Sequence, residues 1–112
     1  MSGKFVIKKS TNGQFYFNLK AGNGEIVLTS ETYARKEGAQ AGIASVRVNA
    51  PLDERYERKT ATNGQFTFVL KAANGEPIGR GELYTTTKAR EDGIAVVKRE
   101  APGAAAEDHS PV

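Results

Sequence analysis

Several residue types that often carry chemistry are scarce in this sequence. Its 112 residues include no cysteine, no tryptophan and a single histidine. Without cysteine there can be no disulfide, no cysteine-based zinc site and no catalytic thiol, so a reducing compartment is permitted. No apolar run approaches the roughly 18 residues of a membrane-spanning helix, and the N-terminus leads into a strand-like segment without a signal-peptide h-region. We therefore expect a cytoplasmic protein with no membrane association.

The net charge is modest and unevenly distributed. Sixteen Lys and Arg residues against 13 Asp and Glu give a formal charge of +3, and most of the excess falls in residues 1–51. This is far from the dense basic clustering that marks nucleic-acid-binding proteins, so nucleic acid is an unlikely partner. Residues 103–112 lack a bulky apolar side chain until Val112. They cannot bury enough surface to offset chain entropy, which predicts a flexible C-terminal tail.

The chain contains a tandem duplication with a period of 51 residues. Residues 5–51 align with residues 56–102 without a gap. The segment Thr-Asn-Gly-Gln-Phe begins at Thr11 and again at Thr62, and Gly-Ile-Ala begins at Gly42 and again at Gly93. Such a long ungapped match indicates an internal repeat, which is the first feature to establish in any fold prediction.

Within each repeat, the spacing of hydrophobic residues changes from every second residue, as in a strand, to about every 3.6 residues, as in a helix. Phe15, Phe17 and Leu19 alternate with polar positions, as in a half-buried strand, and Asn-Gly pairs on both sides predict type I′ hairpin turns. Ile43 and Val46 then recur at helical spacing. Predicted core residues are Phe15, Phe17, Leu19, Ile43 and Val46, with Phe66, Phe68, Leu70, Ile94 and Val97. Predicted strands are residues 4–9, 14–21, 25–29, 56–60 and 76–80, and Phe66, Phe68 and Leu70 repeat the second of them.

Four further local features follow from the same reading. Pro77 restricts its strand to a sheet edge or to a strand start. Thr86 or Thr87 is a good N-cap for the second helix, whereas Arg35 is a poor one for the first. The mid-helix residues Gly42 and Gly93 indicate close approach of each helix to the sheet. The segment from Gly79 to Gly81 resembles a strained strand end or a bulge.

These elements predict an α+β fold in which two β-β-β-α units merge. A unit of about 50 residues is marginal alone, because it buries about 60% or less of its unfolded surface. We expect a single domain over residues 1–102, built from repeats at about 4–51 and 55–102. One mainly antiparallel sheet would carry two helices on one face, giving a monomer with internal pseudo-dimer symmetry.

With these motifs, the chain resembles the YegP-like family of small, uncharacterised bacterial proteins. The resemblance rests on the Asn-Gly-Gln-Phe-x-Phe-x-Leu-Lys-Ala-x-Asn-Gly-Glu segment, on Ser30, Glu31 and Tyr33, and on residues 42–46. It implies paired three-strand-helix-strand units that form one sheet, with the final strands of the units exchanged. The resemblance implies no activity and no functional residues.

No set of residues predicts a catalytic, metal or cofactor site. His109 lies in the predicted tail without a partner for acid–base or metal chemistry. Glu31 with Tyr33, and Glu82 with Tyr84, recur at matching positions and form a hypothetical repeated pair. Repeated architecture explains them more simply, with the glutamate near a helix start and the tyrosine packed on the core. An enzyme or small-ligand binder that uses these residues is therefore a distant alternative.

The outward face of the predicted sheet is the other candidate surface. Tyr16, Lys20 and Lys71 are the residues expected to contact a partner there. An aromatic ring beside lysines on an open sheet can bind single-stranded nucleic acid, although the second repeat adds no ring to this face. The leading interpretation is therefore a non-enzymatic structural or partner-binding module, with another protein as the candidate partner. Weak single-stranded nucleic-acid binding is the alternative, and composition and motifs alone do not name the partner.

Overall fold

The computed structural model describes residues 3–110, and all six predicted strands and both predicted helices are present there. In chain order the elements are β1 (Lys4–Lys9), β2 (Phe15–Lys20), β3 (Ile26–Ser30), α1 (Lys36–Asn49), the 3-10 turn η1 (Asp53–Arg55), β4 (Tyr56–Thr60), β5 (Phe66–Lys71), β6 (Pro77–Arg80), α2 (Thr87–Glu100), the 3-10 turn η2 (Ala101–Gly103) and β7 (Ala105–Asp108). Pro77 is the first residue of β6, so the proline marks a strand start rather than a sheet edge.

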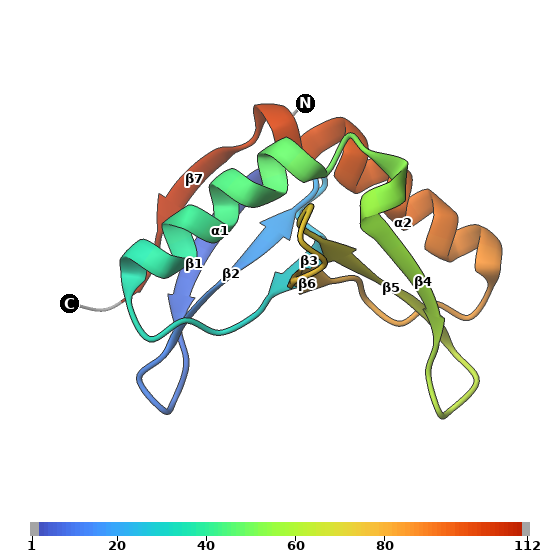
Figure 1. Ribbon diagram of the computed structural model, residues 1–112, viewed down its shortest axis with the longest axis horizontal. Coiled ribbons are helices and arrows are strands. Elements are labelled where there is room, and N and C mark those ends of the chain that lie inside the picture. Colours follow the sequence, from blue (N-terminus) through green and yellow to red (C-terminus); the bar gives the residue numbers. More distant parts are fainter. Residues whose placement is uncertain (1–2, 111–112) are drawn as a thin grey trace.

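The strands of this region form one sheet in the order β4-β5-β6-β3-β2-β1-β7 (Figure 1). Neighbouring strands run antiparallel, except that β7 runs parallel to β1. The two repeats join where β3 pairs with β6, with Thr29 opposite Arg80 and Ser30 opposite Gly79. The predicted α+β fold with one mainly antiparallel sheet is confirmed.

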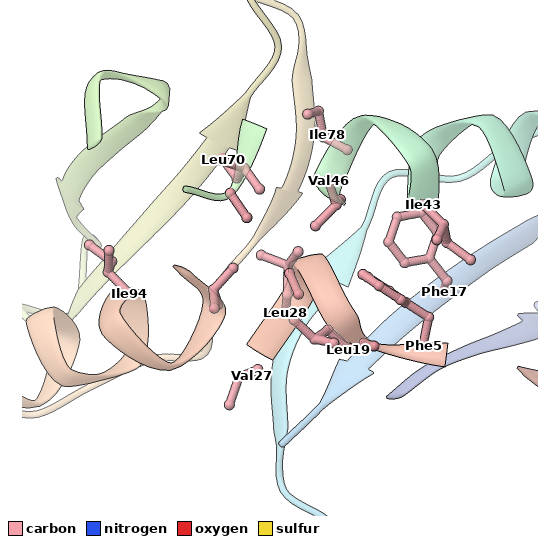
Figure 2. Close-up of a cluster of buried hydrophobic side chains, with 14 of the residues drawn as sticks. Phe5, Phe17, Leu19, Val27, Leu28, Ile43, Val46, Leu70, Ile78 and Ile94 are labelled. Carbon is pink, nitrogen blue, oxygen red and sulfur yellow. The ribbon is translucent and has the colours of Figure 1, made fainter. Parts of the chain in front are cut away.

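Both helices pack on the same face of the sheet. Phe17 and Leu19 of β2 lie in one buried cluster with Ile43 and Val46 of α1, and the cluster continues into the second repeat (Figure 2). Helix α1 also contacts β5 and β6, and α2 contacts β3, so each helix covers part of the other repeat. The two units therefore share a single core. The other buried members predicted from the sequence are Phe68, Leu70, Ile94 and Val97.

Phe15 and Phe66 are less buried than predicted. Each is half-exposed at the margin of the core and packs against it. Cationic side chains lie over the two rings: Lys9 is 5.4 Å from the Phe15 ring centre, and Arg90 is 5.6 Å from that of Phe66. Lysine and arginine can cover an aromatic ring while their charged ends remain in water. The alternation correctly predicted that both rings point toward the core, but both rings are less buried than it predicted.

The Asn-Gly turns differ from the predicted type I′ geometry. In the first hairpin the Gly13 N–H donates to the Ser10 carbonyl (3.0 Å), and the Ser10 N–H donates to the Gln14 carbonyl (2.7 Å). Only glycines have positive φ within the described residues, with Gly13 at 83°. The Asn12 side chain instead accepts a hydrogen bond from the Gln14 N–H (3.2 Å). The connection therefore has three residues, and its glycine adopts the left-handed conformation. The asparagine side chain caps the turn by accepting this hydrogen bond.

The helix starts agree with the sequence. The Thr86 hydroxyl accepts a hydrogen bond from the Ala89 N–H (3.0 Å), whereas Arg35 makes no side-chain cap. A Cβ on Gly42 would lie 2.9 Å from Cε2 of Phe17, and one on Gly93 would meet the Tyr84 ring at 2.7 Å. These contacts are too close for a methyl group. Both glycines therefore allow their helix to lie close to the aromatic side chains between the helix and the sheet.

The predicted flexible tail is wrong for the described residues after 103. Residues 105–108 form β7, which pairs with β1 from Lys4 opposite Ala105 to Ile7 opposite Asp108. Backbone hydrogen bonds and ion pairs hold this strand, and its side chains are exposed. Low apolar content therefore did not exclude a strand, because the edge of β1 supplied its hydrogen-bond partners. Residues 111–112 of the predicted tail lie outside the described residues.

Candidate binding face of the sheet

The face of the sheet opposite the helices, called the open face below, has a continuous row of paired residues. The strand registers align one residue from each strand across the whole sheet. From edge to edge the row is Glu107, Val6, Asn18, Thr29, Arg80, Val69 and Glu57. The two repeats meet between Thr29 and Arg80, which occupy equivalent positions 51 residues apart. The centre of the open face is therefore also the junction of the repeats.

This centre is partly shielded from water. Val6 is fully buried although it lies opposite the helices, and Asn18 is 4% exposed. The Asn18 amide donates to the Thr29 hydroxyl (3.0 Å), so the buried polar side chain has a partner. Buried polar groups need such partners to offset their loss of hydration. The inner part of the open face is thus an ordered surface rather than a loose layer of solvated side chains.

Two neighbouring hollows lie on the open face and share Thr29 and Arg80 as a common wall. The first has a volume of about 560 Å³ and the second of about 440 Å³. The first is otherwise lined by Lys9, Ser10, Thr11, Tyr16, Ser30, Glu31 and Thr32, and the second by Thr67, Gly81, Glu82 and Leu83. Most of these positions correspond under the 51-residue shift. The first hollow is rich in hydroxyl groups, which can donate hydrogen bonds to an oxyanion.

Arg80 is the cation at the centre of this surface. It is exposed, and it makes no ion pair within residues 3–110. Lys8, Lys20 and Lys59 also belong to the open face by their registers. Lys59 is exposed, Lys8 and Lys20 are half-buried, and none of the three makes an ion pair within residues 3–110. A guanidinium presents several N–H donors in a plane, a geometry that matches carboxylates and phosphates. Most of the unpaired positive charge of the strands therefore lies on the open face.

Cations on the helix side are mostly paired. Arg58 donates to Glu91 (2.9 Å) and to Asp53 (3.0 Å), and Lys98 also donates to Asp53 (2.7 Å). Hydrogen bonds from Arg58 lower the pKa of Glu91, and those from Lys98 and Arg58 lower the pKa of Asp53. These carboxylates remain ionised and keep the cations neutralised. This side consequently offers less free positive charge to a partner.

The three residues predicted to contact a partner have different surroundings. Tyr16 lines the first hollow, where it is half-buried. Lys20 lies on the open face without an ion pair in the described part of the chain. Lys71, however, pairs with Glu57 at 2.5 Å, and this hydrogen bond lowers the pKa of Glu57. Its charge is therefore less available than that of Lys20.

The repeated glutamates and tyrosines point to separate surroundings. Tyr33 exchanges two backbone hydrogen bonds with Phe15 (both 2.7 Å), its ring stacks on Phe17, and its hydroxyl lies next to Gly42 of α1. Burial, and then the charge of Glu31, raises the pKa of Tyr33. Glu31 itself is exposed and lines the first hollow of the open face. Tyr84 packs against Gly93 of α2 in the same way, and burial and then Glu82 raise its pKa, but Glu82 lines the hollow beside α2 together with Tyr84 as well as the second hollow of the open face.

Arg80, Thr29 and Lys9 were not among the residues singled out from the sequence. Pro77 and the register shift between Leu70 and Lys71 obscure the alternation of β6. The sequence nevertheless contained a signal that could have identified Arg80. The 51-residue shift aligns Arg80 with Thr29, which lies two residues before Glu31. The glycines around Arg80 reflect close packing rather than strain. A Cβ on Gly81 would overlap the Phe68 ring, and neither Gly79 nor Gly81 has a positive φ.

A larger hollow of about 720 Å³ lies on the helix side, between α2 and the β2–β3 turn. Its floor includes Tyr84 and Val96, and its carboxylates are Glu25, Glu82 and Asp92. Asp92 is paired with Lys88 (3.0 Å). This acidic groove contrasts with the open face. Residues of both repeats line this groove, and Glu82 lines it as well as the second hollow of the open face.

Two further findings concern residues 3–110. No three His, Cys, Asp or Glu side chains in this range gather in a way that could hold a metal ion. Helices α1 and α2 have 14 residues each, and no helix here is long and apolar enough to cross a membrane. His109 is exposed, and its Nε2 lies 3.0 Å from Glu107.

Comparisons with known proteins agree with this architecture. The sequence model of the family described as "Domain of unknown function (DUF1508)" matches residues 10–57 and again residues 61–108. The two matches are offset by 51 residues, which is the period of the repeat. Each matched unit therefore starts just before β2 or β5 and ends within β4 or β7.

The chain is also similar to individual bacterial proteins. It is 58% identical to the UPF0339 protein YegP of Escherichia coli over 98 residues, which cover 88% of this chain and 89% of the relative. It is 57% identical to a UPF0339 protein of Bordetella pertussis over 110 residues, 98% of each chain. The solution NMR structure of E. coli YegP, a protein of unknown function, superposes with a TM-score of 0.94 at 52% identity, covering 100% of this chain and 97% of that one. A UPF0339 protein of Shewanella oneidensis gives a TM-score of 0.92 at 45% identity, covering 98% and 93%.

Proposed function

This chain belongs to the DUF1508 family, and we propose that it is a non-enzymatic module that binds an acidic protein partner through the open face. The observation that carries the proposal is Arg80, an exposed cation at the junction of the two repeats, on the wall shared by two hollows. Arginine is enriched at the energetically dominant positions of protein interfaces. Its equivalent in the first repeat is Thr29, so this charge belongs to one repeat only.

The surroundings of Arg80 support an acidic partner. Lys9 lines the same hollow, and Lys8, Lys20 and Lys59 add positive charge to the open face. Tyr16 and the hydroxyls of the first hollow supply hydrogen-bond donors at its rim. Carboxylates of a partner would find both charge and donors here, while Glu31 and Glu82 would disfavour an anion in the wrong position.

The non-enzymatic part of the proposal has its own support. Acid–base catalysis needs a donor and an acceptor that reach the same reacting atom. The Tyr33 hydroxyl lies against α1, whereas Glu31 lines a hollow of the open face. In the second repeat, Glu82 and Tyr84 both line the hollow beside α2, and the Tyr84 hydroxyl lies against Gly93 of that helix. We further propose a bacterial protein that works as a monomer in the cytoplasm; its relatives come from bacteria.

Nucleic acid is less well supported than an acidic protein. Proteins that hold single strands usually stack several bases on aromatic rings. Tyr16 supplies one ring to the open face, and the equivalent position in the second repeat is Thr67. A single half-buried ring offers little stacking area.

The proposal can be tested by NMR titration of the full chain with a short oligoglutamate peptide. We expect amide shifts at Thr29, Arg80 and Gly81. Replacing Arg80 with Thr, the residue of the other repeat, should weaken binding about tenfold, as expected for loss of a charge-assisted hydrogen bond.

The matched control is Lys88→Thr, which removes an exposed cation from α2 and should leave the affinity unchanged. Two results would overturn the proposal. One is peptide binding that ignores Arg80→Thr. The other is tighter binding of oligothymidylate that depends on Tyr16 and persists at physiological salt, which would favour nucleic acid.

A further inference from the structure

The acidic groove between α2 and the β2–β3 turn lies where the symmetry of the two repeats breaks down. In the first repeat the Glu31 N–H donates to the Ile78 carbonyl (3.1 Å), which ties the segment after β3 to β6. Under the 51-residue shift the equivalent pair is Glu82 with Val27. No backbone hydrogen bond joins these two residues within residues 3–110, and both line the groove. The segment after β6 is therefore not tied to β3 in this way, and the groove lies between them.

The lining of the groove is more apolar than the corresponding positions of the first repeat. Among its positions in residues 82–96, three that differ between the repeats are more apolar here and one is acidic. The residues of the first repeat and their counterparts in the groove are Thr32 and Leu83, Gly38 and Ala89, Ser45 and Val96, and Ala41 and Asp92. Leu83 is 53% exposed and Val96 is half-buried, so both leave apolar surface in contact with water. A ligand that covers this surface gains free energy of binding.

Two exposed carboxylates of the groove have no cationic partner in the described part of the chain. Glu25 and Glu82 make no ion pair there, whereas Asp92 makes one. The Asn23 amide donates to the Glu25 carboxylate (3.0 Å) and so orients it. Burial, and then the charges of Glu82 and Glu25, raise the pKa of Tyr84, so both carboxylates lie near this residue of the floor. The groove therefore combines an apolar floor with two free negative charges.

We propose that the acidic groove binds a basic segment of a partner protein, with one apolar side chain on its floor and lysine or arginine on either side. The apolar anchor matches the exposed surface of Leu83 and Val96, and the flanking cations match Glu25 and Glu82. A metal ion would leave the apolar floor uncovered, and both carboxylates would repel a nucleic acid. The volume of about 720 Å³ is in the usual range for a ligand site. This site is separate from the wall shared by the two open-face hollows, and the inference does not rest on the proposed function.

The experiment is an NMR titration of the full chain with the acetylated and amidated peptide Lys-Lys-Leu-Lys-Lys. We expect saturable shifts of the Leu83 and Val96 methyl groups and of the Glu25 amide. The peptide Lys-Lys-Ser-Lys-Lys should bind about tenfold more weakly, because it lacks the apolar anchor, and spermidine should also bind more weakly. Leu83→Thr, which introduces the residue of the first repeat at an exposed position, should weaken binding of the leucine peptide about three- to tenfold.

The repeat supplies a matched pair of variants that tests the contribution of charge. Glu76 is the equivalent of Glu25 and is exposed, and its N–H donates to Asn74 (3.0 Å) as the Glu25 N–H donates to Asn23 (3.0 Å). Glu25→Gln should weaken binding about two- to fivefold, as for one exposed ion pair, whereas Glu76→Gln should leave it unchanged. The inference is overturned if the shifts fall outside the groove, if the two variants have equal effects, or if the serine peptide or spermidine binds as tightly as the leucine peptide.

Discussion

Arg80 and Thr29 show how one residue can distinguish two halves of a duplicated sheet. They occupy equivalent positions, pair directly with each other, and line both hollows of the open face. With threonine at both positions the centre would be neutral and symmetric. Arginine in the second repeat gives the surface a cation, and the glycines on either side let the backbone approach Leu28 and Phe68 closely. A change in one repeat thus gives the shared face its charge.

The first prediction concerns Phe17, a fully buried ring that packs edge-on against Phe5 and stacks on Tyr33. Phe17→Ala should lower the free energy of unfolding by about 3–5 kcal/mol, because it removes buried surface and leaves a cavity. Denaturant unfolding followed by circular dichroism measures this loss. Phe15→Ala should cost less, since that ring is half-exposed. Equal losses for the two variants would contradict the described packing.

The second prediction concerns the mid-helix glycines. Alanine is favoured over glycine in a helix by about 1 kcal/mol, yet Gly42→Ala should lower stability by up to about 2 kcal/mol, because its Cβ would overlap the Phe17 and Tyr33 rings. For Gly93→Ala the three atoms nearest to the new Cβ all belong to Tyr84, so only one ring has to move to relieve them and the cost should be smaller. Thermal unfolding of both variants tests this order. Adding Tyr33→Phe to Gly42→Ala should recover part of the loss, and a stabilised Gly42→Ala would contradict the account.

At the scale of elements, β7 marks the limit of what the sequence could predict. The alternation of apolar and polar residues predicted β2 and β5, and the change to helical spacing predicted both helices. The alignment of the chain with itself predicted that the same elements recur in the second repeat. Residues 105–108 share no identity with residues 54–57, their equivalents. The repeat itself therefore did not predict a strand there, and only the family resemblance, with its exchanged final strands, implied one. Its stability comes from backbone partners on β1, which no local pattern reveals. The same holds for the hollows, since they depend on strand registers far apart in the chain.

The third prediction concerns the pH dependence of β7. Hydrogen bonds from His109 and Lys4 lower the pKa of Glu107, and hydrogen bonds from Lys36 and Ser110 lower the pKa of Asp108. A carboxylate with a lowered pKa in the folded state stabilises it above its ordinary value, near pH 4, and this contribution is lost as the pH falls further.

We therefore expect β7 to separate from β1 on acidification, before the rest of the sheet unfolds. Hydrogen exchange of the His109 amide, which donates to the Ile7 carbonyl, measures this separation after correction for the intrinsic rate. Lys36→Gln should weaken the protection of this amide already at neutral pH. Protection that stays constant down to strong acid would show that the two ion pairs do not hold the strand.

At the scale of the whole molecule, the two repeats depend on each other. Strand β3 pairs with β6, each helix contacts strands of the other repeat, and β7 returns from the second repeat to the edge of the first. In the matched family units, the last strand, β4 in residues 10–57 and β7 in residues 61–108, therefore lies in the other half of the sheet. This exchange explains why residues 1–51 form only part of a core.

The fourth prediction follows from this dependence. Residues 1–51 expressed alone should be unfolded or should dimerise, because the missing half supplies β6, β7 and the neighbouring helix. Sedimentation and circular dichroism distinguish these states. A folded, monomeric half with native-like spectra would contradict the shared core.

The central claim is that the open face around Arg80 is the functional surface. Its most direct test is photo-crosslinking in the cells that naturally express the protein, with p-benzoylphenylalanine in place of Tyr16 in the first hollow, or of Val48, which is 70% exposed on α1. We predict a discrete crosslinked protein from position 16 that diminishes with Arg80→Thr, and none from position 48. Equal crosslinking from both positions, or a product from position 48 alone, would contradict the claim.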